Sequence, residues 1–440
     1  MNIAELYELY QKHPQISTDT RALPEGCLFF ALRGENFDGN TFAEQALQQG
    51  AAYAVIDNPT YYKPTPQYIL VPNTLATLQE LARYHRQQLK IPIIGITGSN
   101  GKTTTKELIS AVLSQKYATL ATKGNLNNHI GVPLTILAIR PQTEIAVIEM
   151  GANHVGEIAF LCTIAQPSYG LITNIGKAHL EGFGGFEGVI QAKTELYRYV
   201  DMHQGTLFYC HDNPLLLQQV QKLSCQKVSY GISPDAHIKG YIHKENNSPF
   251  LSFSFLDKEG KEYAVTTSLF GNYNFENAMA AVALGQTFGV ASRDIATAIE
   301  AFQPQNNRSQ VVQHQSNRVI CDFYNANPSS MENAITNFAR LPVENLSKIV
   351  ILGEMKELGH DSDMEHQRIV ALAESLTFEK ILLVGKAYQS VERRKALFFE
   401  SNSDIIEHLS ENKIEHSYVL IKGSRGARLE EVYNAIFHQG

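Results

Sequence analysis

The sequence has few cysteines and no long apolar run, and both absences exclude classes of protein. Its five cysteines are odd in number, scattered and without a CxxC pair, so they indicate neither a disulfide framework nor a zinc site. No apolar stretch approaches the roughly 18 residues that cross a bilayer. The N-terminal segment MNIAELYELYQKHPQ carries acids where a signal peptide needs a basic flank and an apolar run. We therefore expect a cytoplasmic protein without membrane insertion.

An excess of positive charge is also absent. Lysine and arginine number 37 against 44 aspartate and glutamate residues, which gives a net charge of −7. This balance argues against a nucleic-acid partner and against binding to anionic membranes, so any phosphate site must be local. The hydrophobic share of 44% and the charged share of 18% are those of a folded globular protein. At roughly 150 residues per domain, this length predicts about three domains.

The first predicted domain, residues 1–90, alternates short strand-like and helix-like stretches. Apolar runs at Gly26–Leu32 and Ala51–Ile56 predict strands, and the pattern of Leu75–Gln88 predicts a helix. These patterns indicate a small α/β unit.

The second predicted domain, residues 91–305, begins with the buried-strand run IPIIGIT. A glycine-rich turn and the helix-like KELISAVLSQ follow at once. Strand-like runs recur at Glu144–Met150 and Tyr169–Ile175 with helical sequence between them, which indicates a parallel sheet with crossover helices. Alternating patterns within Tyr230–Leu269 predict antiparallel hairpins, as a β annex to this domain.

The third predicted domain, residues 306–440, follows the polar stretch Gln303–Gln310, which we expect to serve as linker and hinge. Its strand-like runs RVICDFY, KIVILGEM, KILLVGK and SYVLIKGS are each followed by helical sequence, as in a doubly wound sheet. The predicted fold class is therefore α/β in three domains, with a central P-loop-type parallel sheet and a C-terminal Rossmann-like domain.

The glycine-rich turn predicts an ATP-binding loop. Small residues let backbone N–H groups crowd around phosphate oxygens, the helix N-terminus adds the positive end of its dipole, and Lys102 adds a full charge. The strict pattern GxxxxGK[ST] fails because Ile96 stands where the first glycine should be, so the match is to a shorter GxxGKTT variant. A glycine-rich turn with a surface lysine is the alternative. The predicted nucleotide-binding residues are Gly98, Ser99, Asn100, Gly101, Lys102, Thr103 and Thr104.

Two oxygen-bearing side chains beside this loop predict a Mg²⁺ site. Thr103 is placed like the P-loop hydroxyl that binds Mg²⁺. Glu149 ends the strand-like run VIEMG, so its carboxylate is expected in the crevice at the carboxyl ends of the strands. The residues alone support a capping or salt-bridged acid at Glu149 equally well.

Five longer segments occur in the order GITGSNGKTTTKELI, GNLNNHIGVPLTIL, IEMGANHVGEIAFL, TNIGKAHLEGFGG and GNYNFENAMAAVALG. Together they resemble the Mur ligases, which join amino acids or a dipeptide to the growing peptidoglycan precursor, and the resemblance covers nearly the whole chain. Within that family, DFYNANPSSM, LGEMKELG and KGSR are similar to the MurF type. The DNPR motif of the diaminopimelate-adding relative is missing from the third domain.

The MurF resemblance implies a reaction and its reactants. ATP and Mg²⁺ are implied as cofactors, and D-alanyl-D-alanine is joined to UDP-N-acetylmuramoyl-tripeptide through an acyl phosphate. We expect a monomer in which the domains close to assemble the site and to exclude water from the acyl phosphate. Whether the third peptide residue is lysine or diaminopimelate stays open, because that specificity depends on pocket shape.

The resemblance assigns catalytic roles to Lys102, His179 and Lys193. His179, in a glycine-flanked loop, is implied to bind a second Mg²⁺. Lys193 falls where Mur ligases can carry a carbamylated lysine, whose new carboxylate can face metal. The implied metal-binding residues are thus Thr103, Glu149, His179 and, if carbamylated, Lys193. A structural histidine and a solvated helix lysine are the alternatives.

Further ATP contacts implied by the resemblance are Asn274, Asn277, Arg308, Asp322 and Tyr324. Asn277 can equally be a helix N-terminal residue. The sequence departs from the family pattern twice. Tyr273 replaces the histidine of GxHN, and Cys321 and Phe323 replace the first aspartate and the serine of DDSYNANP. Any role of that first carboxylate is therefore absent.

Substrate contacts are implied in three places. The segment STDTR, with LRGENFDGNTF, resembles the part that holds the uridine diphosphate end, and GNLNNHIGVP the part that meets the nucleotide sugar. Asn325 and Asn327 of YNANP are expected to position the incoming dipeptide or the phosphate. Lys422 and Arg425 of KGSR follow a strand, at a place where an anionic carboxylate can be held. Helix caps, turns and an exposed basic loop are the alternatives. The implied residues are Ser17, Thr18, Asp19, Arg21, Asn125, Asn127, Asn128, Asn325, Asn327, Lys422 and Arg425.

Two other functions compete with this interpretation. A folate polyglutamate synthase shares the P-loop and the metal residues but should lack YNANPSSM and ELG. An ATP-binding regulatory module descended from a ligase is the second alternative. The presence of Lys102, Glu149, His179 and Lys193 argues against a module without enzymatic activity.

Overall fold

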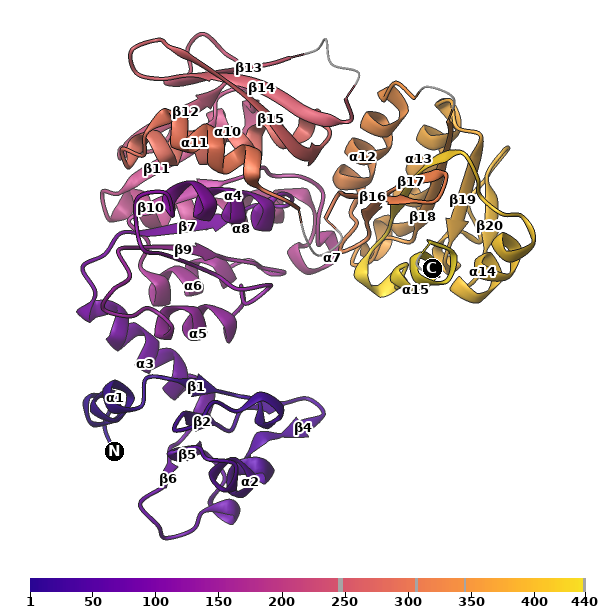
Figure 1. Ribbon diagram of the computed structural model, residues 1–440. Coiled ribbons are helices and arrows are strands. Elements are labelled where there is room, and N and C mark those ends of the chain that lie inside the picture. Colours follow the sequence, from indigo (N-terminus) through magenta and orange to yellow (C-terminus); the bar gives the residue numbers. More distant parts are fainter. Residues whose placement is uncertain (244–247, 305–307, 344–345, 438–440) are drawn as a thin grey trace.

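The computed structural model describes residues 1–440 except 244–247, 305–307, 344–345 and 438–440. Its strands form three sheets, which have four, nine and six strands in that order along the chain. Two further strands form a separate ribbon. Figure 1 shows the three sheets as separate parts, with the first below the central one and the third beside it. The α/β class predicted from the sequence is confirmed.

The first part is a small parallel sheet with helices against it. Its strands lie in the order β1 (Ile16–Ser17), β2 (Leu28–Phe30), β5 (Tyr53–Ile56) and β6 (Tyr68–Leu70). The ribbon consists of β3 (Arg33–Gly34) and β4 (Phe37–Asp38), and the helices are α1 (Ile3–Lys12), α2 (Ala43–Gln48) and α3 (Thr74–Gln88). Strands β2 and β5 fall inside the two predicted apolar runs, whereas β1, β6 and the two ribbon strands are further strands that no pattern predicted.

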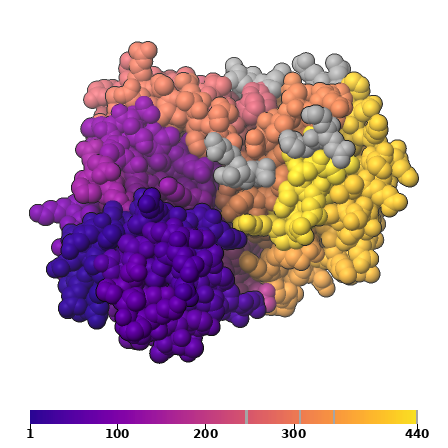
Figure 2. Space-filling model, turned by 60° about the horizontal axis from the view of Figure 1, so that its bottom comes forward, coloured from indigo at the N-terminus to yellow at the C-terminus, as the bar shows by residue number. Residues whose placement is uncertain are grey.

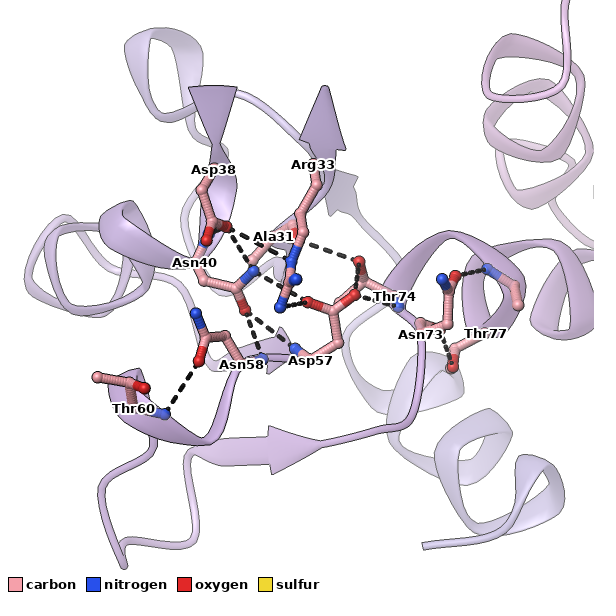
Figure 3. Close-up of polar contacts among 11 residues, drawn as sticks. Ala31, Arg33, Asp38, Asn40, Asp57, Asn58, Thr60, Asn73, Thr74 and Thr77 are labelled. Atoms are coloured by element: carbon pink, nitrogen blue, oxygen red, sulfur yellow. Dashed lines mark hydrogen bonds and ion pairs between the residues drawn. The ribbon is translucent and has the colours of Figure 1, made fainter. Parts of the chain in front are cut away.

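A buried asparagine holds this part together. The Asn40 amide group donates to Asp38 Oδ1 at 2.6 Å and to Asp57 Oδ1 at 3.0 Å, and its oxygen accepts from the Asp57 N–H at 2.9 Å. Asp57 also accepts from the Thr74 hydroxyl and forms an ion pair with Arg33 at 2.8 Å. Figure 3 shows how these side chains converge from four separate segments. The hydrogen bonds lower the pKa of Asp57 despite its burial.

The central sheet is parallel over most of its width. Its nine strands lie in the order β15 (Glu262–Phe270), β14 (Phe250–Leu256), β13 (Ile238–Ile242), β12 (Gln226–Gly231), β11 (Thr206–Cys210), β10 (Tyr169–Ile172), β7 (Ile93–Thr97), β9 (Ile145–Glu149) and β8 (Thr119–Ala121). All pairs from β13 to β8 are parallel, whereas β13–β14 and β14–β15 are antiparallel. The β annex therefore continues the same sheet.

Two groups of helices cover the central sheet. One group packs together as α4 (Lys102–Leu113), α10 (Phe275–Thr287) and α11 (Ser292–Ala301). The other comprises α5 (Gly131–Leu137), α6 (Glu157–Ala165) and α8 (Phe186–Met202), against which α3 of the first part also packs. Strand β7 is buried at all five positions, as expected for a strand covered on both faces.

The first part is bound to the central part through polar contacts as well as through α3. The Tyr10 hydroxyl donates to the Leu137 carbonyl at 2.7 Å, and Arg140 donates to the Tyr10 hydroxyl and to the Pro14 carbonyl. His85 of α3 contacts the Ile139 carbonyl at 3.1 Å. These contacts fix the first part against α5.

The third part is a six-stranded sheet. Its strands lie in the order β16 (Gln310–His314), β17 (Asn317–Asp322), β21 (Ser417–Lys422), β18 (Ser347–Gly353), β19 (Lys380–Val384) and β20 (Leu397–Phe399), with β16 antiparallel and the others parallel. Its helices are α12 (Pro328–Arg340), α13 (Ser362–Ser375), α14 (Asn402–Glu411) and α15 (Glu430–Phe437). The four predicted strands are present, while β16 and β20 were not predicted.

The surface shows the same division. In Figure 2 the indigo N-terminal residues form one lobe and the yellow C-terminal residues another, on different sides of the central part. The predicted linker Gln303–Gln310 and the boundary at 305 and 306 include residues 305–307, which lie outside the described residues. The domain boundaries stay predictions. Within the described ranges, no helix is long and apolar enough to cross a membrane.

Replacing Asn40 with alanine should destabilise the first part by about 2–3 kcal/mol, because it leaves the buried N–H of Asp57 without a partner. Hydrogen exchange of the β5 amides in a urea series measures this change. Thr77→Ala is the matched control: its hydroxyl donates one hydrogen bond, to the Asn73 carbonyl at 2.8 Å, and its loss should cost less than about 1 kcal/mol. Equal effects of both variants would contradict the role given to Asn40.

Candidate active site

A cavity of about 810 Å³ opens at the carboxyl ends of the central parallel strands. Glu149 ends β9, the glycine-rich loop follows β7, Asn174 follows β10 and Asn213 follows β11, and all of them line it. The far wall comes from the third part, including Tyr324 of the segment after β17. Loops after parallel strands meet at one edge of a sheet, and such an edge is the usual ligand site of an open α/β sheet. The cavity is therefore the candidate active site.

The glycine-rich loop is shaped by two glycines with positive φ. Gly98 has a φ of +146°, and a Cβ atom there would lie 2.0 Å from the Thr173 hydroxyl. Gly101 has a φ of +78° and directly precedes α4, where a Cβ would lie 2.6 Å from Asn277 Oδ1. The loop backbone thus lies closer to its neighbours than any side chain permits, and this leaves the N-terminus of α4 open toward the cavity.

Lys102 lies at the mouth of this loop. Its ammonium donates to the carbonyls of Gly98 at 2.7 Å and Ser99 at 3.1 Å. Burial lowers its pKa, an effect that the nearby Glu149 opposes and Arg308 reinforces. An anionic phosphate chain beside this amine would favour its charged form. Ser99, Asn100, Gly101, Thr103 and Thr104 also line the cavity.

Glu149 offers a buried oxygen that lacks a hydrogen bond. The residue is 1% exposed, its Oε1 accepts from the Asn127 amide at 2.8 Å, and its Oε2 has no hydrogen-bond partner among the described residues. Lys106 is the nearest cation, with its Nζ 4.0 Å from Oε2. A carboxylate oxygen beside the hydroxyl-bearing Thr103 suits a hard divalent cation. The described residues contain no cluster of three His, Cys, Asp or Glu side chains, so such a cation would also depend on water or phosphate oxygens.

His179 lies at the edge of the cavity, in the left-handed region with a φ of +52°. Its Nδ1 forms a hydrogen bond with Glu357 Oε2, which comes from the third part. This hydrogen bond lowers the pKa of Glu357. The ring is therefore oriented from across the boundary between the central and third parts.

Lys193 is buried just behind the cavity wall. It is 1% exposed, its Nζ lies 3.4 Å from the carbonyl of Ala152, which lines the cavity, and it lies 5.0 Å from the centroid of the Phe183 ring. Burial lowers its pKa to about 7, and the positive charge of Lys102 contributes. Lys193 itself is not among the residues that line the cavity. It is not the solvated helix lysine of the alternative reading.

The asparagines of GNLNNHIGVP all line the cavity but differ in their contacts. Asn127 is engaged by Glu149, and Asn128 Oδ1 accepts from the Gly131 N–H at 2.9 Å at the start of α5. Asn125 is exposed. Asn128 thus binds backbone N–H groups of the turn that leads into α5, and Asn127 positions the carboxylate of Glu149.

Asn274 and Asn277 line the cavity, and Asn277 lies directly beside Gly101 of the glycine-rich loop. The Thr105 hydroxyl donates to Asn277 Oδ1 at 3.0 Å, the Asn277 amide donates to Asn274 at 2.8 Å, and the Asn274 amide donates to the Phe270 carbonyl at 2.8 Å. This chain of amides joins α4 to α10. Tyr273, which replaces the family histidine, also lines the cavity and bonds Ser309 at 2.8 Å.

The third part contributes a group of charged and aromatic side chains. The Arg308 guanidinium lies 3.8 Å from the Tyr324 ring centroid, and Arg425 lies 5.8 Å from it on a separate segment. The buried Lys422 forms an ion pair with Asp322 at 2.6 Å. Arg308, Asp322, Tyr324, Asn325 and Lys422 line the cavity, whereas Arg425 and Asn327 do not.

Asn327 has a different position. It caps α12 by accepting from the Ser330 N–H at 2.9 Å, and Pro328 occupies the first helical turn. Its amide donates to Asn100 Oδ1 of the glycine-rich loop at 2.7 Å. The NANP motif therefore ties the third part to the phosphate loop.

The structure does not bring Ser17, Thr18, Asp19 and Arg21 into this cavity. Arg21 pairs with Asp19 at 2.6 Å on the surface of the first part, and this pairing lowers the pKa of Asp19 to about 2. Ser17 is a buried residue of β1 whose hydroxyl donates to the Asp19 carbonyl at 2.8 Å.

Three acids near the site escaped the sequence analysis, namely Glu157, Glu276 and Glu357. Glu276 lines the cavity, and burial together with the charge of Asp212 raises its pKa to about 7. Glu357 holds His179. Glu357 belongs to the motif LGEMKELG and Glu276 to GNYNFENA, so both motifs were recognised without a role for these carboxylates.

Comparison with known proteins agrees with this architecture. Three family models match the chain: "Mur ligase family, catalytic domain" over residues 14–86, "Mur ligase middle domain" over 96–285 and "Mur ligase, glutamate ligase domain" over 307–425. The chain belongs to the Mur ligase family.

Individual relatives show to which branch of the family this chain is similar. The UDP-N-acetylmuramoyl-tripeptide–D-alanyl-D-alanine ligase of Bacillus subtilis (strain 168) is 36% identical over 451 residues, covering 98% of this chain and 96% of the relative. A crystal structure of MurF from Acinetobacter baumannii matches with a TM-score of 0.86 and 32% identity, covering 96% of this chain and 93% of that one. MurF from Thermotoga maritima, solved in complex with ADP, matches with a TM-score of 0.83 and 26% identity over 97% of each chain. The resemblance to the MurF type is confirmed.

Replacing Gly98 with alanine should weaken ADP binding at least about tenfold, because the residue has a φ of +146° and the new Cβ would lie 2.0 Å from the Thr173 hydroxyl. Isothermal titration calorimetry with ADP measures this. Gly426→Ala is the control, because its nearest neighbour would lie at 3.4 Å and its φ is not positive. Undiminished affinity in the Gly98 variant would mean that the loop does not cradle the nucleotide.

Proposed function

We propose that this protein joins D-alanyl-D-alanine to UDP-N-acetylmuramoyl-tripeptide at the expense of ATP, with release of ADP and phosphate. The product is the UDP-N-acetylmuramoyl-pentapeptide precursor of peptidoglycan. The observation that carries the proposal is the cavity in which Lys102 and Glu149 of the central sheet face side chains of the third part, in a chain whose MurF relatives match nearly end to end.

Amide formation needs an activated carboxylate. The tripeptide carboxylate attacks the γ-phosphorus of ATP and forms an acyl phosphate, and ADP leaves. The dipeptide amine then attacks the acyl carbon, phosphate leaves, and the amine loses a proton. Both steps gather negative charge on phosphoryl oxygens, so Lys102 and the N-terminus of α4 stabilise them electrostatically.

Magnesium fits the oxygen donors at the loop. Thr103 and the unpaired oxygen of Glu149 are the residues that would hold it, with His179 and a carbamylated Lys193 for a second ion. When bound, Mg²⁺ neutralises phosphate charge and polarises the phosphorus–oxygen bonds. The lowered pKa of Lys193 supports carbamylation, because only the neutral amine attacks carbon dioxide.

The contacts with the other reactants are assigned from the family resemblance. Asn274, Asn277, Arg308, Asp322 and Tyr324 surround ATP. Asn125 faces the nucleotide sugar together with Asn127 and Asn128, and the Ser17–Arg21 segment holds the uridine diphosphate. Asn325, Asn327, Lys422 and Arg425 serve the dipeptide side. A monomer in the cytoplasm, in which the third part closes on ATP, completes the proposal.

Replacing Lys102 with alanine should lower D-alanyl-D-alanine-dependent phosphate release by at least about 100-fold, because one preorganised charge at a developing oxyanion supplies that order of rate. A coupled phosphate assay with and without dipeptide provides the measurement. Lys413→Ala, at an exposed surface position, should retain full activity. ADP formation at the same rate without dipeptide, or full turnover by the Lys102 variant, would refute the proposed reaction.

Carbamylation of Lys193 should depend on pH. Because its pKa is lowered to about 7, the amine is largely neutral above that pH and largely protonated below it. With ¹³C-bicarbonate, we expect a carbamate carbon signal at pH 8 that falls as the pH drops through about 7 and is missing from Lys193→Met. The exposed Lys222→Met variant should keep the signal. A signal that survives in Lys193→Met would place the modification elsewhere.

A further inference from the structure

The loop that carries His179 is held in place by contacts with the third part of the chain. Two short segments meet there: Lys177–Glu181, which leads into α7 (Leu180–Phe183), and Met355–Gly359, which follows β18. In Figure 1, α7 lies between the central sheet and the third part. None of the predicted site residues comes from Met355–Gly359.

We propose that Glu357 is a positioning residue for His179. Its carboxylate holds the imidazole in one orientation and one tautomer at the edge of the cavity, so that docking of the third part completes the active site. The proposal deepens the proposed ligase function and rests on it for the catalytic consequence, whereas the orientation of the ring is a property of the protein alone.

The contact between the two side chains sets the tautomer. A carboxylate only accepts hydrogen bonds, so Nδ1 of His179 must be the donor to Glu357 Oε2. In a neutral imidazole the lone pair is then left on Nε2. Carboxylate partners of this kind fix ring orientation and raise the basicity of the other nitrogen.

His179 depends on this partner because its own loop gives it little support. The side chain is 21% exposed, and its nearest aromatic neighbour is Phe183, edge-on at 6.3 Å between centroids. The backbone is in the left-handed region, with a φ of +52°. A ring on such a segment has several rotamers available unless a polar partner selects one.

Glu357 is itself held in place. Its backbone has a φ of +61°, and its carbonyl accepts from the Glu181 N–H at 3.3 Å. Gly359 packs so closely on Glu181 that a Cβ would lie 3.2 Å from the Glu181 Cβ. Upstream, the Met355 N–H donates to the buried His366 at 3.0 Å. The backbone segment that carries the Glu357 carboxylate is therefore fixed by hydrogen bonds and by packing.

A second contact with the third part holds the same loop and does not involve His179. Lys177 forms an ion pair at 2.6 Å with Glu365, which is 1% exposed and also bonded to Arg368 at 2.8 Å. The Lys177 N–H donates to the Ser329 hydroxyl at 3.1 Å. Lys177 does not line the cavity. This ion pair therefore joins the same two parts without orienting His179. Removing it tests whether a general loss of contact between the parts lowers activity.

The experiment compares three variants of the full chain. Glu357→Ala should lower kcat by about 10–100-fold, the range for losing the outer partner of a functional histidine, while KM for ATP changes less than about threefold. Glu357→Gln retains an acceptor oxygen and should keep kcat within about fivefold. Lys177→Met, the matched control, should stay within about threefold.

A second measurement does not depend on activity. Nitrogen-15 NMR of histidine-labelled protein, without metal or nucleotide, with His179→Asn used for assignment, should show His179 as the Nδ1–H tautomer in the wild type and in Glu357→Gln. It should show a mixture of tautomers in Glu357→Ala. Thermal unfolding verifies that each variant is folded.

The outcomes separate the possibilities. An unchanged kcat in Glu357→Ala would overturn the proposal. Equal losses in Glu357→Ala and Lys177→Met would overturn it too, because both contacts would then only hold the two parts together. An unchanged tautomer in Glu357→Ala would overturn it as well. If the wild type shows no dipeptide-dependent phosphate release, the proposed reaction fails, but the NMR comparison still decides whether Glu357 orients His179.

Discussion

The parallel pairing of β7 with a neighbour on each side is the constraint on which the site depends. Ile96 is in register with Glu149 of β9, and Thr97 with Ile172 of β10. Because the three strands run the same way, their last residues emerge at one level of one edge. The loop at Gly98 is thereby placed between a carboxylate on one side and the segment that leads to the histidine on the other. A shift in either register would separate the phosphate loop from the groups that serve it.

The same edge gathers charged groups that the fold buries. Among the described residues, Glu149 keeps one buried oxygen without a hydrogen bond, and burial lowers the pKa of both Lys102 and Lys193. Desolvated charges of this kind cost stability unless a partner compensates them. In the proposed reaction, a triphosphate beside Lys102 and a divalent cation beside the carboxylate of Glu149 would supply those partners. Perturbed pKa values of this kind are usual at functional sites.

The local parts of the site could be predicted from the sequence, whereas the contacts between distant segments could not. The loop Gly98–Thr104 and the end of β9 follow from an apolar run and the residues next to it, because period and position determine both. The pairing of His179 with Glu357 joins residues that are 178 apart in sequence, and no pattern in either segment encodes that distance. The same holds for the amide of Asn327, which reaches Asn100 only because two separate sheets are docked.

Strand geometry explains the two departures of the sequence from the family pattern DDSYNANP. Side chains alternate between the two faces of a strand and its extension, so Cys321 and Phe323 share one face and Asp322 and Tyr324 the other. Cys321 and Phe323 are buried in the hydrophobic core of the third part, with 1% and 2% exposure. Asp322 and Tyr324 line the cavity. The two replacements therefore adjust packing behind the strand, while the aspartate and the tyrosine of the pattern are kept on the face that lines the cavity.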